Sequence, residues 1–304
     1  MLFYLYSHVH ARHDKSQINP EFLSRNFIMI KRYDGRENNS IRPLVIQYDV
    51  LGYSDASVFF ELGQTKILVA VTLKHGVPPF LKGSRTGWLT AEYAMLPCAT
   101  HERTMRESNQ NQRNARSIEI SRLIGRSLRT IVDLSVIGEQ TITIDCDVLQ
   151  ADGGTRTAAI TAASLALELA AKRWIAEGFI PASFFKEPIA AISAGIINKI
   201  PCLDISYQED SIADADFNFV ITKSGKLIEV QGTCEKTPAT WEEFEILKNL
   251  CVDGIKELFA QSEKFPFPDD FREKLDRPSR NAQHNIQHKE ARTAFFSLGN
   301  RLTK

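Results

Sequence analysis

Residues 141–177 read TITIDCDVLQADGGTRTAAITAASLALELAAKRWIAE, and they set the expected architecture. Residues 141–145 alternate polar and apolar side chains with the period of a strand. Residues 156–177 are rich in alanine and apolar on most faces, as in a buried helix. A strand that passes through two glycines into a buried helix, in a chain that mixes strands with long helices, predicts an α/β (α+β) domain.

The turn within this stretch, residues 150–158, is the first candidate for chemistry. Gly153 and Gly154 allow a tight turn in which backbone N–H groups approach a ligand, and Thr155 is a good helix N-cap. Arg156 then lies at the positive end of the helix dipole, which is unfavourable unless an anion lies nearby. The turn therefore fits a phosphate site, and it fits equally a plain strand–turn–helix junction with a solvated arginine. Its glycine spacing is not that of an ATP or dinucleotide loop.

Periodicity on both sides of this stretch supports the same fold class. Residues 58–62 alternate, Gly63 and Gln64 form a turn, and residues 66–71 are a continuous apolar run, which together predict a hairpin. Apolar side chains at helical spacing predict a helix over residues 117–131. The other expected elements are strands at about 188–197, 202–208, 215–222 and 227–232 and an amphipathic helix at about 240–260.

The chain divides into three zones. Residues 1–28 lack a regular period and precede a second methionine, Met29, so we expect an upstream mis-start, with a genuine extension as the alternative. Residues 29–264 carry strong periodicity and form the expected folded domain. Residues 265–304 are expected to be a polar, flexible C-terminal tail.

Composition excludes several classes of protein. Of 304 residues, 43% are hydrophobic, which is enough for a core, and 37 basic residues balance 37 acidic ones. No apolar run is long enough to cross a membrane, and the N-terminus lacks the features of a secretory signal. Five scattered cysteines without C-x-x-C spacing argue against a disulfide framework or a structural zinc site. These features predict a cytoplasmic protein without a membrane partner.

An acidic cluster at residues 209–216 is the second candidate for chemistry. Carboxylate oxygens at this density suit Mg²⁺ or Mn²⁺. The alternative is an exposed acidic turn without a ligand. The four carboxylates are Glu209, Asp210, Asp214 and Asp216.

Arginines form the third candidate. Residues 101–130 hold seven arginines and three glutamates inside a middle zone whose net charge is −4. Arg103 and Arg106 lie in a polar stretch, and Arg122 begins a helical stripe with Arg126 and Arg129. An arginine-bearing loop of this kind fits a role in following a phosphate backbone. The alternative for the stripe is a solvated face with intrahelical ion pairs.

Six stretches together resemble the ribonuclease PH family of phosphate-dependent exoribonucleases, which trim the 3′ ends of tRNA. The resemblance runs in order through residues 29–264 and implies a mixed β-sheet with packed helices, the fold also called ribosomal protein S5 domain 2-like. The stretches are RYDGR at 32–36, FLKG at 80–83, GWLTAEYAMLP at 87–97, IEISRLI at 118–124, DCDVLQADGGTRTA at 145–158 and IEVQGT at 228–233.

The resemblance assigns roles to particular positions. It implies that inorganic phosphate is held by Arg116, Gly154, Thr155 and Arg156, and that Asp210 and Asp216 position a divalent cation, Mg²⁺ or Mn²⁺. Among these, Asp210, Asp216, Arg116 and Arg156 would be catalytic. With the family's RNA-contacting arginines in mind, we expect Arg103, Arg106 and Arg122 to bind RNA. The chain departs from the family at Cys98, where an arginine is usual, and at Lys236, where a glycine is common. The first departure is expected to weaken RNA contact without removing catalysis.

The implied activity is phosphorolytic removal of nucleotides from the 3′ end of tRNA precursors, with release of nucleoside 5′-diphosphates. Because phosphate is the nucleophile, no histidine base is required, and His75 and His101 are the only histidines of the middle zone. The resemblance also implies a homohexameric ring built as a trimer of dimers. The alternative function is a non-catalytic RNA-binding ring subunit of an exosome-like complex.

Overall fold

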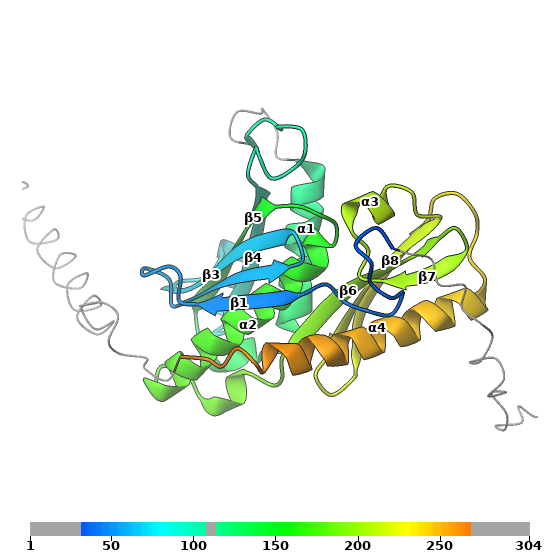
Figure 1. Cartoon of the computed structure of the whole chain (residues 1–304). Coiled ribbons are helices and arrows are strands. Elements are labelled where there is room, and N and C mark those ends of the chain that lie inside the picture. The colour runs from blue at the N-terminus through cyan, green and yellow to red at the C-terminus, as the bar shows by residue number, and fades with distance from the viewer. Residues whose placement is uncertain (1–31, 108–113, 269–304) are drawn as a thin grey trace, which may run out of the picture.

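The computed structural model describes residues 32–107 and 114–268, which fold around two β-sheets (Figure 1). Both the upstream segment 1–28 and most of the expected tail lie outside these residues. The first sheet has the order β1 (Leu44–Tyr48), β2 (Ala56–Leu62), β3 (Thr65–His75), β5 (Gln140–Gln150) and β4 (Trp88–Met95). The second has the order β7 (Ile200–Leu203), β6 (Ile189–Ile197), β8 (Ala215–Thr222) and β9 (Leu227–Cys234).

Within residues 32–107 and 114–268, four α-helices accompany the sheets. Helices α1 (Ala115–Arg129) and α2 (Thr155–Ala176) flank the first sheet, α3 (Tyr207–Asp210) is a single turn, and α4 (Trp241–Ser262) packs on the second sheet. Short 3-10 turns are η2 (Pro79–Leu81), η4 (Leu134–Val136) and η5 (Ala182–Phe184). The prediction of a mixed α/β (α+β) fold is confirmed, and all pairings are antiparallel except that of β4 with β5.

Helix α2 is the centre of the core. It contacts β2, β3 and β5 of the first sheet and β6 and β8 of the second, so apolar side chains surround it. Sixteen of its 22 residues are buried, which explains why the sequence is apolar on most faces rather than on one stripe. The alanines allow both sheets to approach the helix closely. The N-terminus of α2 is therefore fixed by the main hydrophobic core.

One predicted strand has the wrong bounds. The sequence indicated a strand over 202–208, but β7 ends at Leu203 and helix α3 begins at Tyr207. Two local features turn the chain. Asp204 has a positive φ of 50°, and Ser206 and Glu209 form a capping box that starts α3.

The arginine stripe of α1 makes contacts outside its own helix. Arg126 forms an ion pair with Glu229 of β9, and Arg129 donates from Nη1 to the Leu89 carbonyl of β4 at 3.0 Å. The guanidinium of Arg129 also lies 4.8 Å from the centroid of the Trp88 ring. The expected alternative of intrahelical pairs is thus wrong for these two residues, because their partners lie on neighbouring strands. Arg122 is exposed.

The segment before β1 is held by buried ion pairs. Arg32 donates from Nε and Nη2 to the two carboxylate oxygens of Glu209, each at 2.7 Å, so the pair is bidentate. Side chains of both residues are almost inaccessible, with exposed fractions of 1% and 9%. This pair fixes the short helix α3 against the N-terminal segment.

We expect the Arg32–Glu209 pair to make the free energy of unfolding depend on pH. Burial of Glu209 opposes ionisation, but hydrogen bonds from Arg32 and from the Ser206 N–H outweigh it and hold the pKa below its usual 4.5. A lowered folded-state pKa stabilises the fold above pH 4.5, and this contribution is lost as the pH falls through the folded-state pKa. Glu209→Gln is expected to cost about 3 kcal/mol at pH 7 because it leaves Arg32 without a counter-charge.

Urea unfolding of both proteins between pH 7 and pH 3 measures this effect. The difference in unfolding free energy between wild type and Glu209→Gln should shrink below pH 4.5. A constant difference across that range would show that ionisation of Glu209 does not contribute.

Candidate active site

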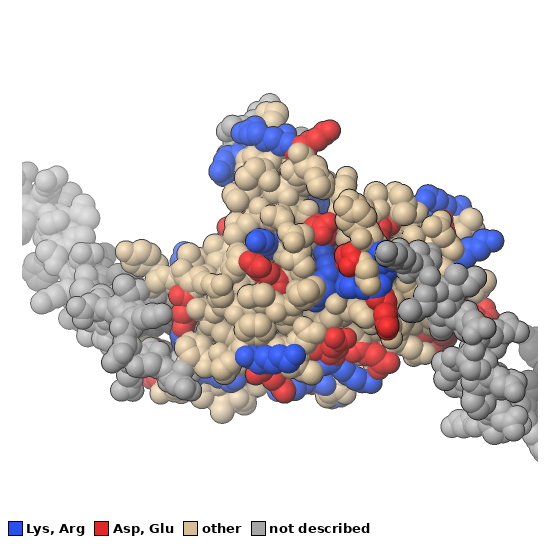
Figure 2. Space-filling view, viewed as in Figure 1, with Lys and Arg blue, Asp and Glu red and all other residues tan. Residues whose placement is uncertain are grey.

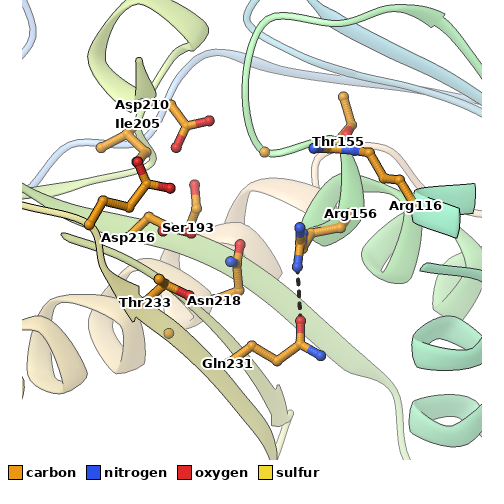
Figure 3. Close-up of a pocket in the computed structure, with 13 residues that line it drawn as sticks. Arg116, Thr155, Arg156, Ser193, Ile205, Asp210, Asp216, Asn218, Gln231 and Thr233 are labelled. Carbon is orange, nitrogen blue, oxygen red and sulfur yellow. Dashed lines mark hydrogen bonds between the residues drawn. The ribbon is translucent and has the colours of Figure 1, made fainter. Parts of the chain in front are cut away.

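One polar pocket opens between the N-terminal ends of α1 and α2 and a face of the second sheet (Figure 3). Its volume is about 240 Å³, which is room for more than one phosphate-sized group. The lining residues are Arg116, Gly154, Thr155, Arg156, Ser193, Ile205, Asp210, Asp216, Asn218, Gln231, Gly232, Thr233 and Glu235.

The glycine turn forms one wall of the pocket. Gly153 and Gly154 both have positive φ angles, 75° and 63°, and Gly154 is the N-cap of α2. The prediction that Thr155 is the N-cap is therefore wrong by one residue. Instead, Thr155 is the first residue of the helix, and its buried hydroxyl accepts a hydrogen bond from Tyr93 at 3.0 Å. The turn leaves the first N–H groups of α2 facing the pocket, where an anion is favoured.

Two guanidinium groups approach the same wall. Arg156 donates from Nη1 to Gln231 Oε1 at 3.0 Å, and its nearest carboxylate is that of Glu119 at 3.6 Å (Figure 3). Arg116 follows Asn114, whose side chain caps α1 by accepting from the Arg116 N–H at 2.9 Å. Together with the α2 N-terminus, these cations make a site for a phosphate-like anion.

An acidic pair lies opposite the arginines. Asp210 ends α3 and Asp216 lies in β8, and both side chains line the pocket. Burial raises the pKa of Asp216 above its usual value, and the neighbouring Asp210 raises it further. Burial also raises the pKa of Asp210, although Arg116 opposes that shift. Two desolvated carboxylates that repel each other are a favourable place for a divalent cation.

The donor set fits Mg²⁺ or Mn²⁺. The described residues contain no group of three or more His, Cys, Asp or Glu that would hold a metal ion by itself. Mg²⁺ is commonly bound by only one or two carboxylates, with water and substrate phosphate as the remaining ligands. Asp210 and Asp216 would supply the carboxylates, and an anion held across the pocket would supply the phosphate oxygens.

The other two members of the acidic cluster have different surroundings. Glu209 is buried against Arg32, as described above. Asp214 lies 4.0 Å from Lys236, whose Nζ also donates to the Ile212 carbonyl. The cluster is thus divided, and only Asp210 and Asp216 face the pocket.

Sequence reasoning missed the floor of the pocket. Neighbouring strands place Ser193 beside Asn218, Asn218 beside Gln231, and Asp216 beside Thr233. All five side chains point to the same face because alternate strand residues share a face. Ser193 Oγ is buried and has no hydrogen-bond partner within the described part of the chain. Alternation of Asp216 and Asn218 with Phe217 and Phe219 was the available signal.

The expected RNA-binding arginines lie outside the pocket. Arg103 and Arg106 are exposed in the loop after β4, and Arg122 is exposed on α1. Figure 2 shows basic side chains on the loop that protrudes above the first sheet. Cys98 is exposed in the same loop. These positions are compatible with contacts to a polymer that extends away from the pocket.

We expect Gly153→Ala to damage both the fold and the site. A Cβ at Gly153 would lie 2.6 Å from the Ile205 carbonyl oxygen, so the backbone would have to move. Gly225, in the turn before β9, has a φ of 86° and open space around it, so Gly225→Ala tests the backbone conformation alone. The conformational cost is about 1–2 kcal/mol for either.

Thermal unfolding should therefore show a loss for Gly153→Ala that exceeds the loss for Gly225→Ala by more than about 1 kcal/mol. Equal losses in the two variants would mean that the close approach to Ile205 imposes no constraint.

The fold and the pocket define an α/β protein in which an anion site at a helix N-terminus faces a pair of aspartates. The two halves of the pocket come from different regions of the sequence. Residues 40–172 match the model of the 3′ exoribonuclease family, domain 1, and residues 187–246 match that of the 3′ exoribonuclease family, domain 2. The chain belongs to this family, the RNase PH family. The first domain carries Arg116 and Gly154 to Arg156, and the second carries Asp210 and Asp216.

Solved structures share the fold. Rrp46 from rice (Oryza sativa) is 19% identical, with a TM-score of 0.61 over 77% of this chain and 99% of that chain. A chain of the Archaeoglobus fulgidus exosome with RNA bound to the active site is 23% identical, with a TM-score of 0.64 over 77% and 92%. A chain of an archaeal exosome core is 21% identical, with a TM-score of 0.59 over 76% and 89%. Among the described helices, none has the length and apolar character needed to span a bilayer.

Proposed function

We propose that this protein is a phosphorolytic 3′-to-5′ exoribonuclease that trims tRNA precursors with inorganic phosphate and releases nucleoside 5′-diphosphates. One observation carries the proposal: an anion site made by Arg116, Thr155 and Arg156 faces Asp210 and Asp216 across a single pocket. Both halves of the site are present in one chain. The pocket offers charge and hydrogen-bond donors for two phosphate groups.

The chemistry needs no nucleophilic side chain. An oxygen of inorganic phosphate attacks the phosphorus of the last phosphodiester, and the bond from that phosphorus to the 3′ oxygen of the preceding nucleotide breaks. The 3′ oxygen leaves and takes up a proton, so the products are a nucleoside 5′-diphosphate and an RNA shorter by one nucleotide. Arg116 and Arg156 would orient the attacking phosphate and balance the charge that develops. Excess nucleoside diphosphate would drive the reverse reaction.

Asp210 and Asp216 would hold Mg²⁺ or Mn²⁺ in the proposed enzyme. A bound cation would neutralise charge on the scissile phosphoryl group. Asp216 would also assist the delivery of a proton to the departing 3′ oxygen.

RNA contacts would come from the loop that carries Arg103 and Arg106 and from Arg122 of α1. We propose a homohexameric ring, a trimer of dimers in the cytoplasm, which would bring several copies of this loop together and raise the local positive charge around the RNA.

A second candidate is a non-catalytic RNA-binding ring subunit. The shared fold with chains of exosome structures favours it. Against it, both the phosphate turn and the acidic pair of this chain line the pocket. A subunit that only binds RNA has no need for both.

Trimming of a tRNA precursor with Mg²⁺, with and without inorganic phosphate, tests the proposal. We expect shortening only with phosphate and release of nucleoside diphosphates. Monophosphates released without phosphate would indicate a hydrolase and overturn the site assignment. Bound but untrimmed RNA would favour the non-catalytic subunit. A precursor and an unstructured RNA compared at equal concentration would test the preference for tRNA.

A further inference from the structure

We propose that Arg42 and Asp204 are a positioning pair that holds the phosphate-binding turn in register with the acidic half of the site. This inference rests on the proposed function, because it assigns a purpose to the phosphate turn. Arg42 lies just before β1, in the first family domain, and Asp204 follows β7 in the second. The pair therefore joins the same two domains that meet at the pocket.

Arg42 contacts both sides of that boundary at once. Its Nη2 and Nε donate to the Asp204 carboxylate at 2.7 and 3.0 Å, and its backbone N–H donates to the same carboxylate at 2.7 Å. Its Nη1 donates in the other direction, to the carbonyl oxygen of Asp152 at 2.5 Å. Asp152 directly precedes the glycine pair. One guanidinium thus bridges the second domain and the turn that would bind phosphate.

The turn is tied down at the same point by a hydroxyl group. Thr65 Oγ1 donates to the Gly153 carbonyl at 2.7 Å and accepts from the Asp152 N–H at 3.1 Å. Arg42 Nη2 lies only 3.2 Å from where a Cβ of Gly154 would stand. These contacts satisfy the carbonyl groups of the turn from behind. The N–H groups at the start of α2 therefore remain directed toward the pocket.

Asp204 connects the pair to the acidic half of the site. Its N–H donates to the carbonyl of Ser193, a residue of the pocket floor, at 2.7 Å. Its own carbonyl accepts from Arg32 and from Arg36, each at 3.1 Å, and Arg32 holds Glu209, the neighbour of Asp210. The left-handed backbone of Asp204 makes these contacts possible from one residue. Movement of Asp204 would shift the floor and the acidic helix together.

Stability alone is a weak reason for this arrangement. The side chains of Arg42 and Asp204 are only 3% and 1% exposed, and desolvation largely offsets the attraction of a buried ion pair. The neighbouring Gly63 leaves the space that Arg42 fills, since a Cβ there would lie 2.5 Å from Arg42 Cδ. The guanidinium of Arg42 is suited to this position because its several N–H donors point in different directions and can bind the Asp204 carboxylate and the Asp152 carbonyl at once.

Arg42→Lys tests the need for these several N–H donors. Lysine keeps the charge and can pair with Asp204, but its single ammonium group cannot reproduce the planar bridge to Asp152. We expect the dissociation constant of inorganic phosphate, measured by calorimetry, to rise at least about tenfold, since small displacements of binding groups have effects of this size. The KM for phosphate should rise in parallel, while affinity for RNA stays unchanged. Asp204→Asn is the second variant and should have the same effect.

Arg173→Lys is the matched control. Arg173 also bridges a carboxylate and a backbone carbonyl, donating from Nη1 to Asp49 Oδ1 at 2.8 Å and to the Asp55 carbonyl at 2.7 Å. It lies near the C-terminus of α2, away from the pocket lining. This variant should lose stability without a change in phosphate affinity.

The outcomes separate this inference from the proposed function. Phosphate affinity within twofold of wild type in a folded Arg42→Lys or Asp204→Asn variant would overturn the positioning role, as would an equal loss in Arg173→Lys. If wild type binds phosphate but releases no nucleoside diphosphate, the proposed function fails, and the three dissociation constants still decide the inference. If wild type binds no phosphate, both fail.

Discussion

Replacing Arg156 with alanine is expected to lower kcat/KM for phosphate in the phosphorolysis reaction about 10³-fold, the size of effect seen when an arginine that stabilises a transferring phosphoryl group is removed. The Arg156 guanidinium lies at the N-terminus of α2 and faces the pocket, with Gln231 as its hydrogen-bond acceptor. Its loss removes a positive charge that would stabilise both the bound phosphate and the transition state. KM for phosphate should therefore rise and kcat should fall.

Lys172→Ala is the control for Arg156→Ala. Lys172 is a cation of the same helix, but it lies near the other end, where it pairs with Glu168 at 2.9 Å. Activity of this variant should stay within about twofold of wild type. Steady-state assays at several phosphate concentrations, together with RNA-binding measurements, test the prediction. Wild-type kinetics in Arg156→Ala would contradict it.

Asp216→Asn is expected to reduce kcat about 10²–10⁴-fold without weakening phosphate binding. This substitution keeps the shape of the side chain but removes a carboxylate that faces the pocket. Because burial and Asp210 raise the folded-state pKa, the ionised carboxylate of Asp216 destabilises the fold at pH values above its ordinary pKa of 3.8. The variant should therefore unfold at the same or a higher temperature than wild type at pH 7 in the presence of EDTA.

Asp214→Asn provides the comparison for Asp216→Asn. Asp214 belongs to the same acidic cluster but lies beside Lys236 and does not line the pocket. We expect near-normal activity from this variant. Similar losses of kcat in both variants would show that the net charge of the cluster matters rather than the position of Asp216. A large drop in Tm for Asp216→Asn would point to a structural role instead.

Much of the fold could be predicted because most helices and strands show their own apolar periodicity within a short stretch of sequence. The hairpin of β2 and β3 and the helices α1, α2 and α4 follow from apolar spacing, with ends correct to within a few residues. Strand β4 was read only as part of a motif, although Leu89, Ala91 and Tyr93 are buried in alternation. The strand predicted at 202–208 runs past the end of β7 at Leu203, because the chain turns there. There the capping box and the backbone of Asp204 decide the conformation.

The candidate site was predictable where its residues are adjacent in sequence. The glycine turn with Arg156 and the acidic cluster at 209–216 stand out as local patterns, whereas Asp210 and Asp216 were selected within that cluster by the family resemblance. The structure brings the turn and these two aspartates to one pocket. The floor was not predictable because it depends on the register of β6, β8 and β9. The contact of Arg42 with Asp204 joins residues that lie 162 positions apart in the sequence, and no local sequence pattern predicts it.

Helix α2 has one further consequence. Its first turn would bind inorganic phosphate, and the rest of the helix is enclosed by both sheets. The phosphate site therefore cannot rearrange without disturbing the core. Arg103 and Arg106, two of the three arginines expected to contact RNA, lie instead on an exposed loop. In the proposed enzyme, substitutions in that loop would alter which RNA ends are accepted, with little effect on the stability of the pocket. Substrate choice and bond-breaking are thereby open to separate selection during evolution.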